Sequence, residues 1–352
     1  MTDYAYYTNE AVALLKRLVT VPSVSRNEGD CARLMVQAME SYGLKPQVCG
    51  CNTFVVSEPF DPSRKTILLN AHIDTVKPVA SWQRDPFAPT VEGDRLYGLG
   101  SNDCGGGLVS LLQVFRIMTA EKAKAKYNFI YLASCEEEVS GAGGISQVLP
   151  LLPMIDVAIV GEPTGMQPAI AEKGLMVLDI TAHGRSGHAA RSEGVNAIYG
   201  ILDDLEWIRN YRFDRVSDLL GPVLMQVTQV NAGTQHNVVP DVCTAVVDVR
   251  TNEFYTNEEV FDIVKSHCRS DVKARSFRLR SSGIDPGHPL VDKCRAMGMT
   301  PFGSPTLSDQ ALMRFPSFKL GPGESSRSHS ADEFICISEI ADAIRKYVTL
   351  LG

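Results

Sequence analysis

The chain has 352 residues, of which 44% are hydrophobic and 21% are charged, and its formal net charge is −7. This length exceeds what one hydrophobic core usually supports, so the sequence predicts two domains. Acidic and basic residues are interspersed without a long basic run, which argues against a nucleic-acid partner. The sequence shows no secretion signal and no 18-residue apolar stretch, and its nine cysteines form no dense disulfide pattern, so we expect a cytoplasmic protein with no membrane association.

The first half of the chain alternates helical and strand patterns. A first helix is predicted from an N-cap near Thr8 to the Val21-Pro22 stop, a second over roughly Asp30–Tyr42 and a third over Gly107–Met118. Apolar runs typical of strands buried on both faces occur at 66–70, 127–133 and 157–160. This order predicts an α/β domain with a mainly parallel sheet and helices on both faces.

From about Gly174 the pattern changes to alternating strands, at 175–182 and 242–250, with amphipathic helices between Val195 and Ile208 and near 258–268. Towards the C-terminus the α/β pattern returns, in elements near 289–297, at 318–320 and from Ile337 onward. We therefore expect a catalytic domain that is interrupted by an inserted α+β lid or dimerisation domain. The predicted division is 1–173, 174–280 and 281–352.

Polar side chains follow each predicted parallel strand. His72 ends the first strand, Glu136–Glu138 follow the second and Glu162 follows the third. Open parallel sheets bind ligands at the carboxyl ends of their strands, so these side chains are expected to share one edge of the sheet. Two isolated histidines, His72 and His329, together with several carboxylates suit a two-metal hydrolytic site. Each motif alone also has a plain structural explanation, such as a capped strand end for His72.

A glycine-rich segment, Gly98–Gly107, precedes the third helix and invites comparison with a phosphate-binding loop. It does not fit the G-x-G-x-x-G pattern, because Asp103 stands where the third glycine is expected, and it lacks the Lys-Ser/Thr of a Walker loop. An acidic side chain there repels phosphate, which argues against a nucleotide-dependent enzyme. Asp103 instead suits a carboxylate that bridges two cations, a role that is compatible with capping the helix.

Three consecutive glutamates, Glu136–Glu138, follow a buried strand. Adjacent carboxylates repel each other unless cations or protons compensate them, so burial beside a metal explains this run better than a solvated surface does. One glutamate can then bind the metal while its neighbour acts as general base. The residues alone leave open which glutamate has which role.

These motifs occur together with several others in a fixed order: Ala71–Val76, Asp85–Phe87, Leu96–Gly98, Asn102-Asp103, Glu137-Glu138, Gly161–Thr164, Ser186–His188, Gly321–Gly323 and Ser328–Glu333. The set resembles the dinuclear zinc amidohydrolases that include acetylornithine deacetylase, succinyldiaminopimelate desuccinylase, aminoacylases and carboxypeptidase G. The resemblance covers nearly the whole chain and is closest to the acetylornithine deacetylase branch. It implies two zinc ions per subunit, for which cobalt can substitute.

The resemblance also implies roles for the motif residues. It implies zinc ligands at five positions. His72 and Glu162 are expected to bind one zinc ion, Glu138 and His329 the other, and Asp103 is expected to bridge the two ions. Asp74 is expected to orient His72. Glu137 is expected to be the general base, because the spacing to Ser140 and Gly143 favours this register, although a slip of one residue stays open.

In the inserted domain, His188 resembles a histidine that reaches the active site of a partner subunit and stabilises the oxyanion, which implies a homodimer. Substrate-binding roles are implied for Asn237, Arg250, Lys173 and Gly321. The chain departs from its relatives at Leu99 and at Cys104-Gly105. These departures remove no metal ligand, but they leave the substrate preference open.

The sequence thus predicts a metal-dependent deacylase that hydrolyses the amide of a small N-acyl amino acid, with N-acetylornithine in arginine biosynthesis as the first candidate. N-succinyl amino acids, N-acylcitrulline and dipeptides are alternatives that would use the same catalytic residues. A non-catalytic metal or amino acid binding protein on the same scaffold is expected to have lost the base or a ligand, and all of these residues are present.

Overall fold

The computed structural model describes residues 2–120, 126–191 and 193–352, and it divides into two compact units. The first unit comprises Met1–Ile170, Ile284–Phe302 and Ser308–Gly352, and the second comprises Ala171–Gly283 and Gly303–Leu307. The predicted division assigned Gly303–Leu307 to the catalytic domain, whereas the structure groups this segment with the second unit. Each unit is described below by itself.

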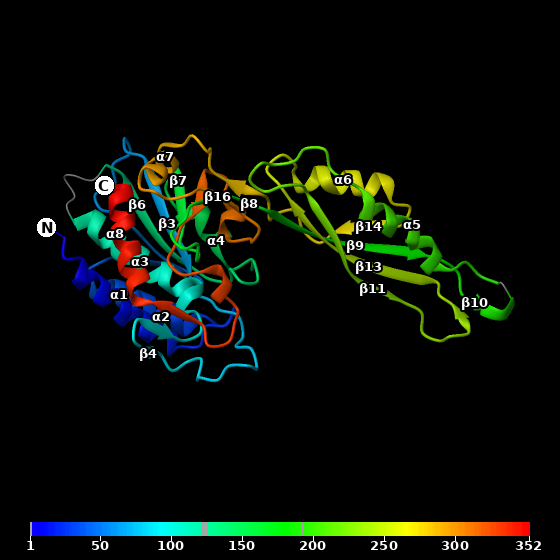
Figure 1. Ribbon diagram of the computed structural model, residues 1–352, viewed down its shortest axis with the longest axis horizontal. Coiled ribbons are helices and arrows are strands. Elements are labelled where there is room, and N and C mark those ends of the chain that lie inside the picture. Colours follow the sequence, from blue (N-terminus) through cyan, green and yellow to red (C-terminus); the bar gives the residue numbers. More distant parts are fainter. Residues whose placement is uncertain (1, 121–125, 192) are drawn as a thin grey trace. The chain divides into compact units, whose positions relative to one another are not determined.

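The first unit is built on a mixed sheet (Figure 1). The strands of this sheet are β1 (Gln47–Cys49), β2 (Asn52–Val56), β3 (Thr66–His72), β6 (Asn128–Ser134), β7 (Val157–Val160), β8 (Ala169–Glu172), β15 (Ser282–Gly283), β16 (Phe302–Ser304) and β17 (Ser317–Lys319). Their order is β1-β2-β6-β3-β7-β17-β8-β15, and β16 also pairs with β8. The strand β15 and parts of β8 and β16 are made of residues that are grouped with the second unit. The central strands β6, β3, β7 and β17 are parallel, whereas β2 and β8 run antiparallel to their neighbours. The predicted mainly parallel α/β sheet is therefore confirmed.

Helices cover both faces of this sheet. They are α1 (Tyr4–Val19), α2 (Gly29–Ser41), α3 (Gly106–Ala120), α4 (Ile145–Val148), α7 (Pro289–Ala296) and α8 (Ile337–Leu351). Figure 1 shows α1, α3 and α8 side by side, and the Tyr131 hydroxyl of β6 donates to the Leu108 carbonyl of α3 on that face. On the opposite face Leu68 and Ile130 pack in one core cluster with Val148 of α4. Because successive strand residues alternate between faces, neighbouring residues of β6 serve both cores.

The start of α1 differs from the prediction. Thr8 does not cap the helix but lies inside it, where its hydroxyl donates to the Tyr4 carbonyl at 2.8 Å. Asp3 caps the helix instead, because its carboxylate accepts from the Tyr6 amide at 3.0 Å. Both residue types favour an N-cap, and a threonine within a helix can satisfy its hydroxyl on the preceding turn.

A small sheet brings two distant segments of the first unit together. Its strands are β4 (Thr90–Glu92), β5 (Arg95–Tyr97) and β18 (Phe334–Cys336), in the order β18-β5-β4. The strand β5 leads into an irregular turn over Ser101–Gly105, in which Asp103 has a non-helical backbone. Short 3₁₀ turns elsewhere in the chain occupy Leu149–Leu151, Ala189–Arg191, Asp309–Leu312 and Ser325–Arg327.

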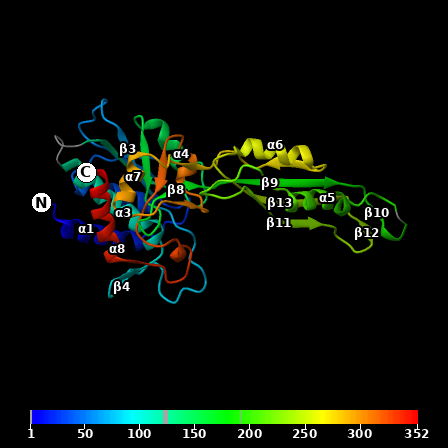
Figure 2. The same cartoon turned by 45° about the horizontal axis from the view of Figure 1, so that its top comes forward.

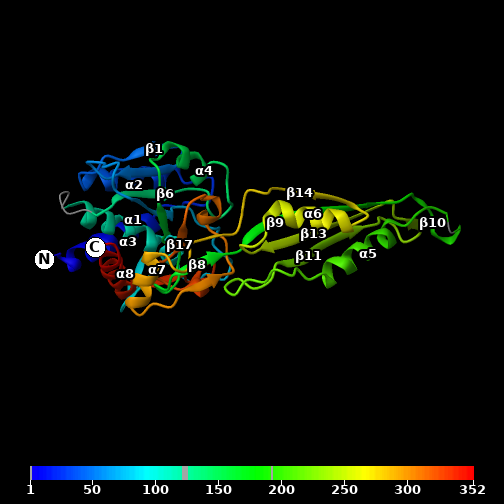
Figure 3. The same cartoon turned by 90° about the horizontal axis from the view of Figure 1, so that it is seen from above.

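The second unit is an antiparallel α+β layer. Its elements are β9 (Gly174–His183), β10 (Gly187–His188), α5 (Ala197–Asn210), β11 (Leu224–Ala232), β12 (Val238–Val239), β13 (Val242–Thr251), α6 (Asn257–His267) and β14 (Asp271–Ala274). The sheet order is β11-β13-β9-β14, and α5 and α6 lie along this sheet (Figure 3). Alternate residues of β9 and β13 are buried in a core shared with both helices. The strands β10 and β12 form a separate two-stranded ribbon (Figure 2).

The sequence prediction overlooked β11, whose residues are mostly exposed on both faces and so lack a clear alternating pattern.

In the described part of the chain, none of the helices has the length and apolar character needed to cross a bilayer.

Candidate metal centre

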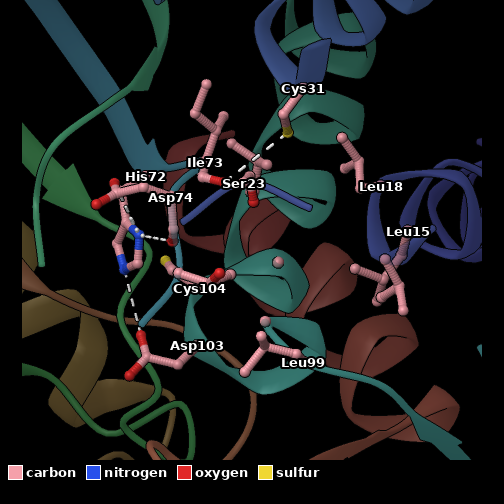
Figure 4. Close-up of a pocket in the computed structure, with 15 residues that line it drawn as sticks. Leu15, Leu18, Ser23, Cys31, His72, Ile73, Asp74, Leu99, Asp103 and Cys104 are labelled. Atoms are coloured by element: carbon pink, nitrogen blue, oxygen red, sulfur yellow. Dashed lines mark hydrogen bonds and ion pairs between the residues drawn. The ribbon is translucent and has the colours of Figure 1, made fainter. Parts of the chain in front are cut away.

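His72 ends β3 and is almost completely buried. Its Nδ1 lies 2.8 Å from the main-chain carbonyl oxygen of Asp74, so this nitrogen carries the proton and donates it. The Asp74 carboxylate is farther from Nδ1, at 3.5 Å, which means that the main chain of Asp74 orients the ring more directly than its side chain does. Nε2 faces the Asp103 carboxylate (Figure 4) and donates to it, because a carboxylate only accepts. Burial lowers the pKa of His72, but the hydrogen bonds with Asp103 and Asp74 outweigh it and raise the pKa well above its usual value. A metal-binding histidine keeps the proton on the nitrogen that donates to the protein, here Nδ1, and a metal ion would replace the proton on Nε2.

Asp103 lies between the two candidate histidine ligands. Its Oδ1 is 3.2 Å from Nε2 of His72, and its Oδ2 is 3.7 Å from Nε2 of His329. A glutamate approaches the same nitrogen of each histidine: Glu162 Oε1 is 3.6 Å from His72 Nε2, and Glu138 Oε2 is 2.9 Å from His329 Nε2. The five ligands expected from the sequence thus converge at the carboxyl edge of the parallel sheet.

The three glutamates point in different directions. The Asp74 carboxylate accepts from the backbone amides of Glu137 and Glu138, at 3.0 and 3.2 Å, and thereby fixes this segment beside His72. The Glu137 carboxylate is 3.9 Å from His72 Nε2. The Glu136 carboxylate instead accepts from the Gly143 amide at 3.1 Å, in its own loop.

Burial and crowding shift the protonation of these groups. Burial raises the pKa of Glu162 to about 8 and the pKa of Glu137 well above its usual value, and neighbouring carboxylates add to both shifts. The hydrogen bond with Glu138 raises the pKa of His329 to about 9. Burial also raises the pKa of Asp103, but the hydrogen bond with His72 outweighs it and the net pKa is lowered. Such a site holds protons when cations are lacking.

The donor atoms fit divalent metal ions. Ligand atoms of His72, Asp103 and Glu138 lie within 4.8 Å of one another. The buried Oε1 of Glu162 has no hydrogen-bond partner among the described residues, although it faces the same space. A buried carboxylate oxygen without a hydrogen-bond donor costs free energy unless it binds a cation. Imidazole nitrogens and carboxylate oxygens are ordinary zinc ligands.

Cys104 lies directly behind this donor set. Its Sγ donates to the Gly161 carbonyl at 3.1 Å, and burial raises its pKa well above the usual thiol value. A small pocket borders it and is lined on the other side by apolar residues of α1, including Leu15 and Leu18 (Figure 4). Together with His72 and Glu162, Cys104 forms a second group whose ligand atoms lie within 4.8 Å of one another.

Gly321 also lies in the first unit, next to the end of β7. Its amide donates to the Thr164 hydroxyl at 3.1 Å. A Cβ at this position would come within 2.4 Å of the Glu162 carbonyl oxygen, so the close approach of the two segments requires glycine.

The remaining predicted residues belong to the second unit, and the partners given for them below also lie in that unit. His188 is exposed on the β10-β12 ribbon, and its Nδ1 accepts from the Ala190 amide. Asn237 is exposed in the adjoining turn, where its carbonyl accepts from Ala189. The Arg250 guanidinium is held by Asp248 at 2.8 Å. Lys173 is buried, donates to the Pro222 carbonyl, and has a pKa that burial lowers.

Two buried carboxylates next to the site, Asp309 and Glu333, were not predicted from the sequence to be site residues. Asp309 accepts from the Ser134 hydroxyl at 2.6 Å, and burial raises its pKa to about 6. Glu333 accepts from three backbone amides of the turn that carries Asp103. Glu333 does stand in the motif that begins at His329, but nothing in its spacing indicates which backbone it contacts.

The family model of peptidase family M20/M25/M40 matches residues 68–352. The chain belongs to this family. The matched segment contains all five candidate ligands, and proteins similar to the chain act as deacylases and peptidases. The chain is accordingly an M20 amidohydrolase.

Curated relatives carry two different names. The chain is 25% identical to acetylornithine deacetylase of Edwardsiella ictaluri, over 92% of each protein. It is 26% identical to succinyl-diaminopimelate desuccinylase of Gluconobacter oxydans, over 98% of this chain and 97% of that one. The two identities differ too little to assign a substrate.

Solved structures with low sequence identity share the fold. An aminopeptidase from Bacillus cereus has a TM-score of 0.78 at 17% identity, with 98% of each chain covered. A dinuclear metal-binding peptidase of the M20 family from Bacillus subtilis has a TM-score of 0.75 at 17% identity, with 99% of this chain and 98% of that one covered. At these identities the likeness shows the fold alone.

Proposed function

We propose that the chain is a dinuclear zinc deacylase that hydrolyses the amide bond of an N-acyl amino acid, with N-acetylornithine in arginine biosynthesis as the first candidate substrate. The position of Asp103 carries this proposal. Its two carboxylate oxygens face the imidazoles of His72 and His329, at 3.2 and 3.7 Å. A carboxylate with an imidazole on each side is suited to bridge a pair of metal ions.

In the proposed centre, Asp103 would hold both ions, His72 and Glu162 would bind one of them, and Glu138 and His329 would bind the other. Bound zinc supplies Lewis-acid polarisation of the substrate carbonyl and lowers the pKa of water. The Nδ1 proton of His72 is held by the Asp74 carbonyl, so the ring presents Nε2 to the proposed metal position beside Asp103. The unpartnered Oε1 of Glu162 supports its role as a ligand.

Glu137 is the proposed general base. It is nearly buried, its carboxylate lies 3.9 Å from the His72 ring, and burial raises its pKa, which strengthens it as a base. In the proposed cycle its carboxylate takes a proton from the attacking water and delivers a proton to the leaving amine. Asp74 holds the Glu137 amide and so keeps the base in place.

The directions of the three glutamates support this register over a slip of one residue. Glu138 contacts His329, as a ligand of the second ion would. The carboxylate of Glu136 is engaged with the Gly143 amide in its own loop. Ideal Cβ atoms built at Gly141 and Gly143 would collide with this carboxylate, so Glu136 closely fills the loop.

We further propose that the second unit forms a homodimer and supplies His188 to the partner subunit's reaction as an oxyanion stabiliser. Exposed apolar side chains on α5, such as Tyr199 at 72% and Leu202 at 52% exposure, support an interface on this unit. The strand β11 is an edge strand that pairs only with β13 among the described strands, and it can accept a second copy. Arg250 and Asn237 remain candidates for binding the substrate carboxylate.

The acyl group and amino acid are the open part of the proposal. A desuccinylase acting on an N-succinyl amino acid is the second candidate, because the relative with that name aligns over 98% of the chain. N-acylcitrulline and dipeptides complete the set. All nine cysteines are free thiols, which supports the proposed cytoplasmic location.

Turnover of purified, zinc-loaded protein on N-acetyl and N-succinyl derivatives of ornithine, citrulline, lysine and diaminopimelate tests the proposal. We expect one acyl amino acid to be hydrolysed at least about tenfold more efficiently than the others, and chelation to abolish the reaction. Glu136→Gln is the matched control, because it removes an adjacent carboxylate that is not assigned to the chemistry. Activity that survives complete metal removal would contradict the proposal, and hydrolysis of dipeptides alone would reject the deacylase in favour of the dipeptidase alternative.

A further inference from the structure

Glu333 is a buried carboxylate whose partners all belong to one turn. It is only 2% exposed. Its Oε1 accepts from the amides of Asn102 and Asp103, at 2.8 and 2.9 Å, and its Oε2 accepts from the amide of Gly100 at 3.2 Å. Three backbone donors on one carboxylate form a binding nest for that side chain.

The turn needs such an acceptor because its backbone is irregular. Gly100 has a left-handed backbone with φ of 74°, and Asp103 has φ of −113° and ψ of 101°, outside the helical region. Amides in these conformations have no carbonyl partners from a regular helix, and buried amides without partners are costly. The Glu333 carboxylate supplies the missing acceptor and fixes the backbone from which the Asp103 side chain projects.

Glu333 also joins this turn to the segment that carries His329. The backbone of Glu333 accepts from the Gly98 amide at 3.0 Å, so main chain and side chain hold the same loop. Nearby, the Asn102 side chain donates to the Glu324 carbonyl and accepts from the Glu324 amide, at 3.0 and 3.1 Å. His329 needs this support more than the other ligands do, because its side chain is 53% exposed.

We propose that Glu333 is a positioning residue of the metal centre: its carboxylate fixes the turn of Asp103 against the segment of His329, so that one side chain sets the distance between the bridging ligand and a ligand of the second ion. The inference rests on the proposed metal centre and names a residue that acts on it without touching metal or substrate. Outer residues that orient metal ligands typically change metal affinity by about 10- to 100-fold.

The test compares Glu333→Gln and Glu333→Ala with wild-type protein in zinc affinity, measured by chelator competition, and in the absorption spectrum of the cobalt-substituted protein. The glutamine keeps one acceptor oxygen and places an amino group against the Gly100 amide. We expect zinc affinity to fall about tenfold in Glu333→Gln and further in Glu333→Ala, with altered cobalt bands in both. If the alanine variant does not fold, the glutamine variant still decides the question.

Asp156→Asn is the matched control. Asp156 Oδ2 accepts from the Thr66 amide at 2.8 Å, at the end of β3 opposite to His72, so its loss affects stability without touching the turn of Asp103. Unchanged zinc affinity and cobalt bands in Glu333→Gln would overturn the inference, as would equal losses in Glu333→Gln and Asp156→Asn. Wild-type protein that binds no zinc would overturn the proposed centre itself, which separates the two failures.

Discussion

The two units of the chain hold their candidate functional residues in opposite ways. In the first unit, His72 and Asp103 lie in a network of partners that come from distant parts of the sequence, and these partners are nearly all buried, with His329 as the exposed one. In the second unit, His188 and Asn237 are exposed, and their described contacts are with neighbours on the β10-β12 ribbon. Arg250 is paired with Asp248, two residues before it in the same strand.

This difference in burial indicates that the two units contribute to function in different ways. Carboxylates that crowd in a buried site cost free energy, so the fold retains them for something that compensates their charge. Exposed residues on a ribbon cost little and are useful once a substrate or a second subunit covers them. The first unit therefore holds a buried cluster of candidate ligands, whereas the candidate residues of the second unit are mostly on its surface, and we expect variants in the two units to lose function in different ways.

The largest effect is expected at Asp103. Asp103→Ala removes the carboxylate that, alone among the described residues, lies within 4.0 Å of the Nε2 atoms of both histidines, so two cations would lie close together without a bridge. We expect zinc to be lost from both positions and turnover to fall to background. Elemental analysis of the dialysed protein gives the stoichiometry, and full zinc content in this variant would defeat the bridging assignment.

A large effect on turnover without loss of metal is expected at Glu137. Glu137→Gln should keep zinc and lose about 10²-fold or more in turnover, because the amide cannot accept the proton. Glu138→Gln should instead weaken zinc binding. Glu136→Gln serves as control and should stay near wild type. If Glu136→Gln is the variant that retains zinc and is inactive, the register is wrong by one residue.

For His188 in the second unit, we expect two inactive variants to restore activity when they are mixed. His188→Ala and Glu137→Gln are each expected to be inactive, and mixing them should restore activity in hybrid dimers that combine one intact base with the partner's intact histidine. Statistical exchange gives hybrids in about half the dimers, so recovery should approach roughly a quarter of wild-type activity. No recovery, despite subunit exchange seen by mass spectrometry, would refute a histidine that acts across the dimer.

A small and purely structural effect is expected within the second unit. Thr256 caps α6 in a reciprocal arrangement with Glu259: its hydroxyl accepts from the Glu259 amide, and the Glu259 carboxylate accepts from the Thr256 amide. Thr256→Ala should lower the free energy of unfolding by about 1 kcal/mol. Denaturant unfolding measures this loss, while zinc content should not change. A loss of zinc would mean that metal binding in the first unit depends on the stability of the second unit.

The sequence predicted the first unit well because its signals are local. Buried parallel strands produce short apolar runs, and polar residues directly after them mark the edge where ligands bind. His72 and Glu162 were located in this manner, and the structure brings them within 3.6 Å of each other.

Other features could not be predicted because they depend on tertiary contacts. The strand β11 is mostly exposed and gives no alternating pattern. The role of Glu333 depends on amides more than 200 residues away in the sequence, in a turn whose irregular backbone has no sequence signature. Asp74 was expected to orient His72 through its carboxylate, yet that carboxylate binds the amides of Glu137 and Glu138 while its main chain holds the ring.

Anomalous diffraction from crystals of the zinc-loaded protein tests the proposed centre most directly. We expect two zinc peaks about 3.5–4 Å apart, with Asp103 between them, His72 and Glu162 on one ion, and Glu138 and His329 on the other. A single zinc peak, or a centre in which Glu136 is a ligand and Glu138 is not, would contradict it.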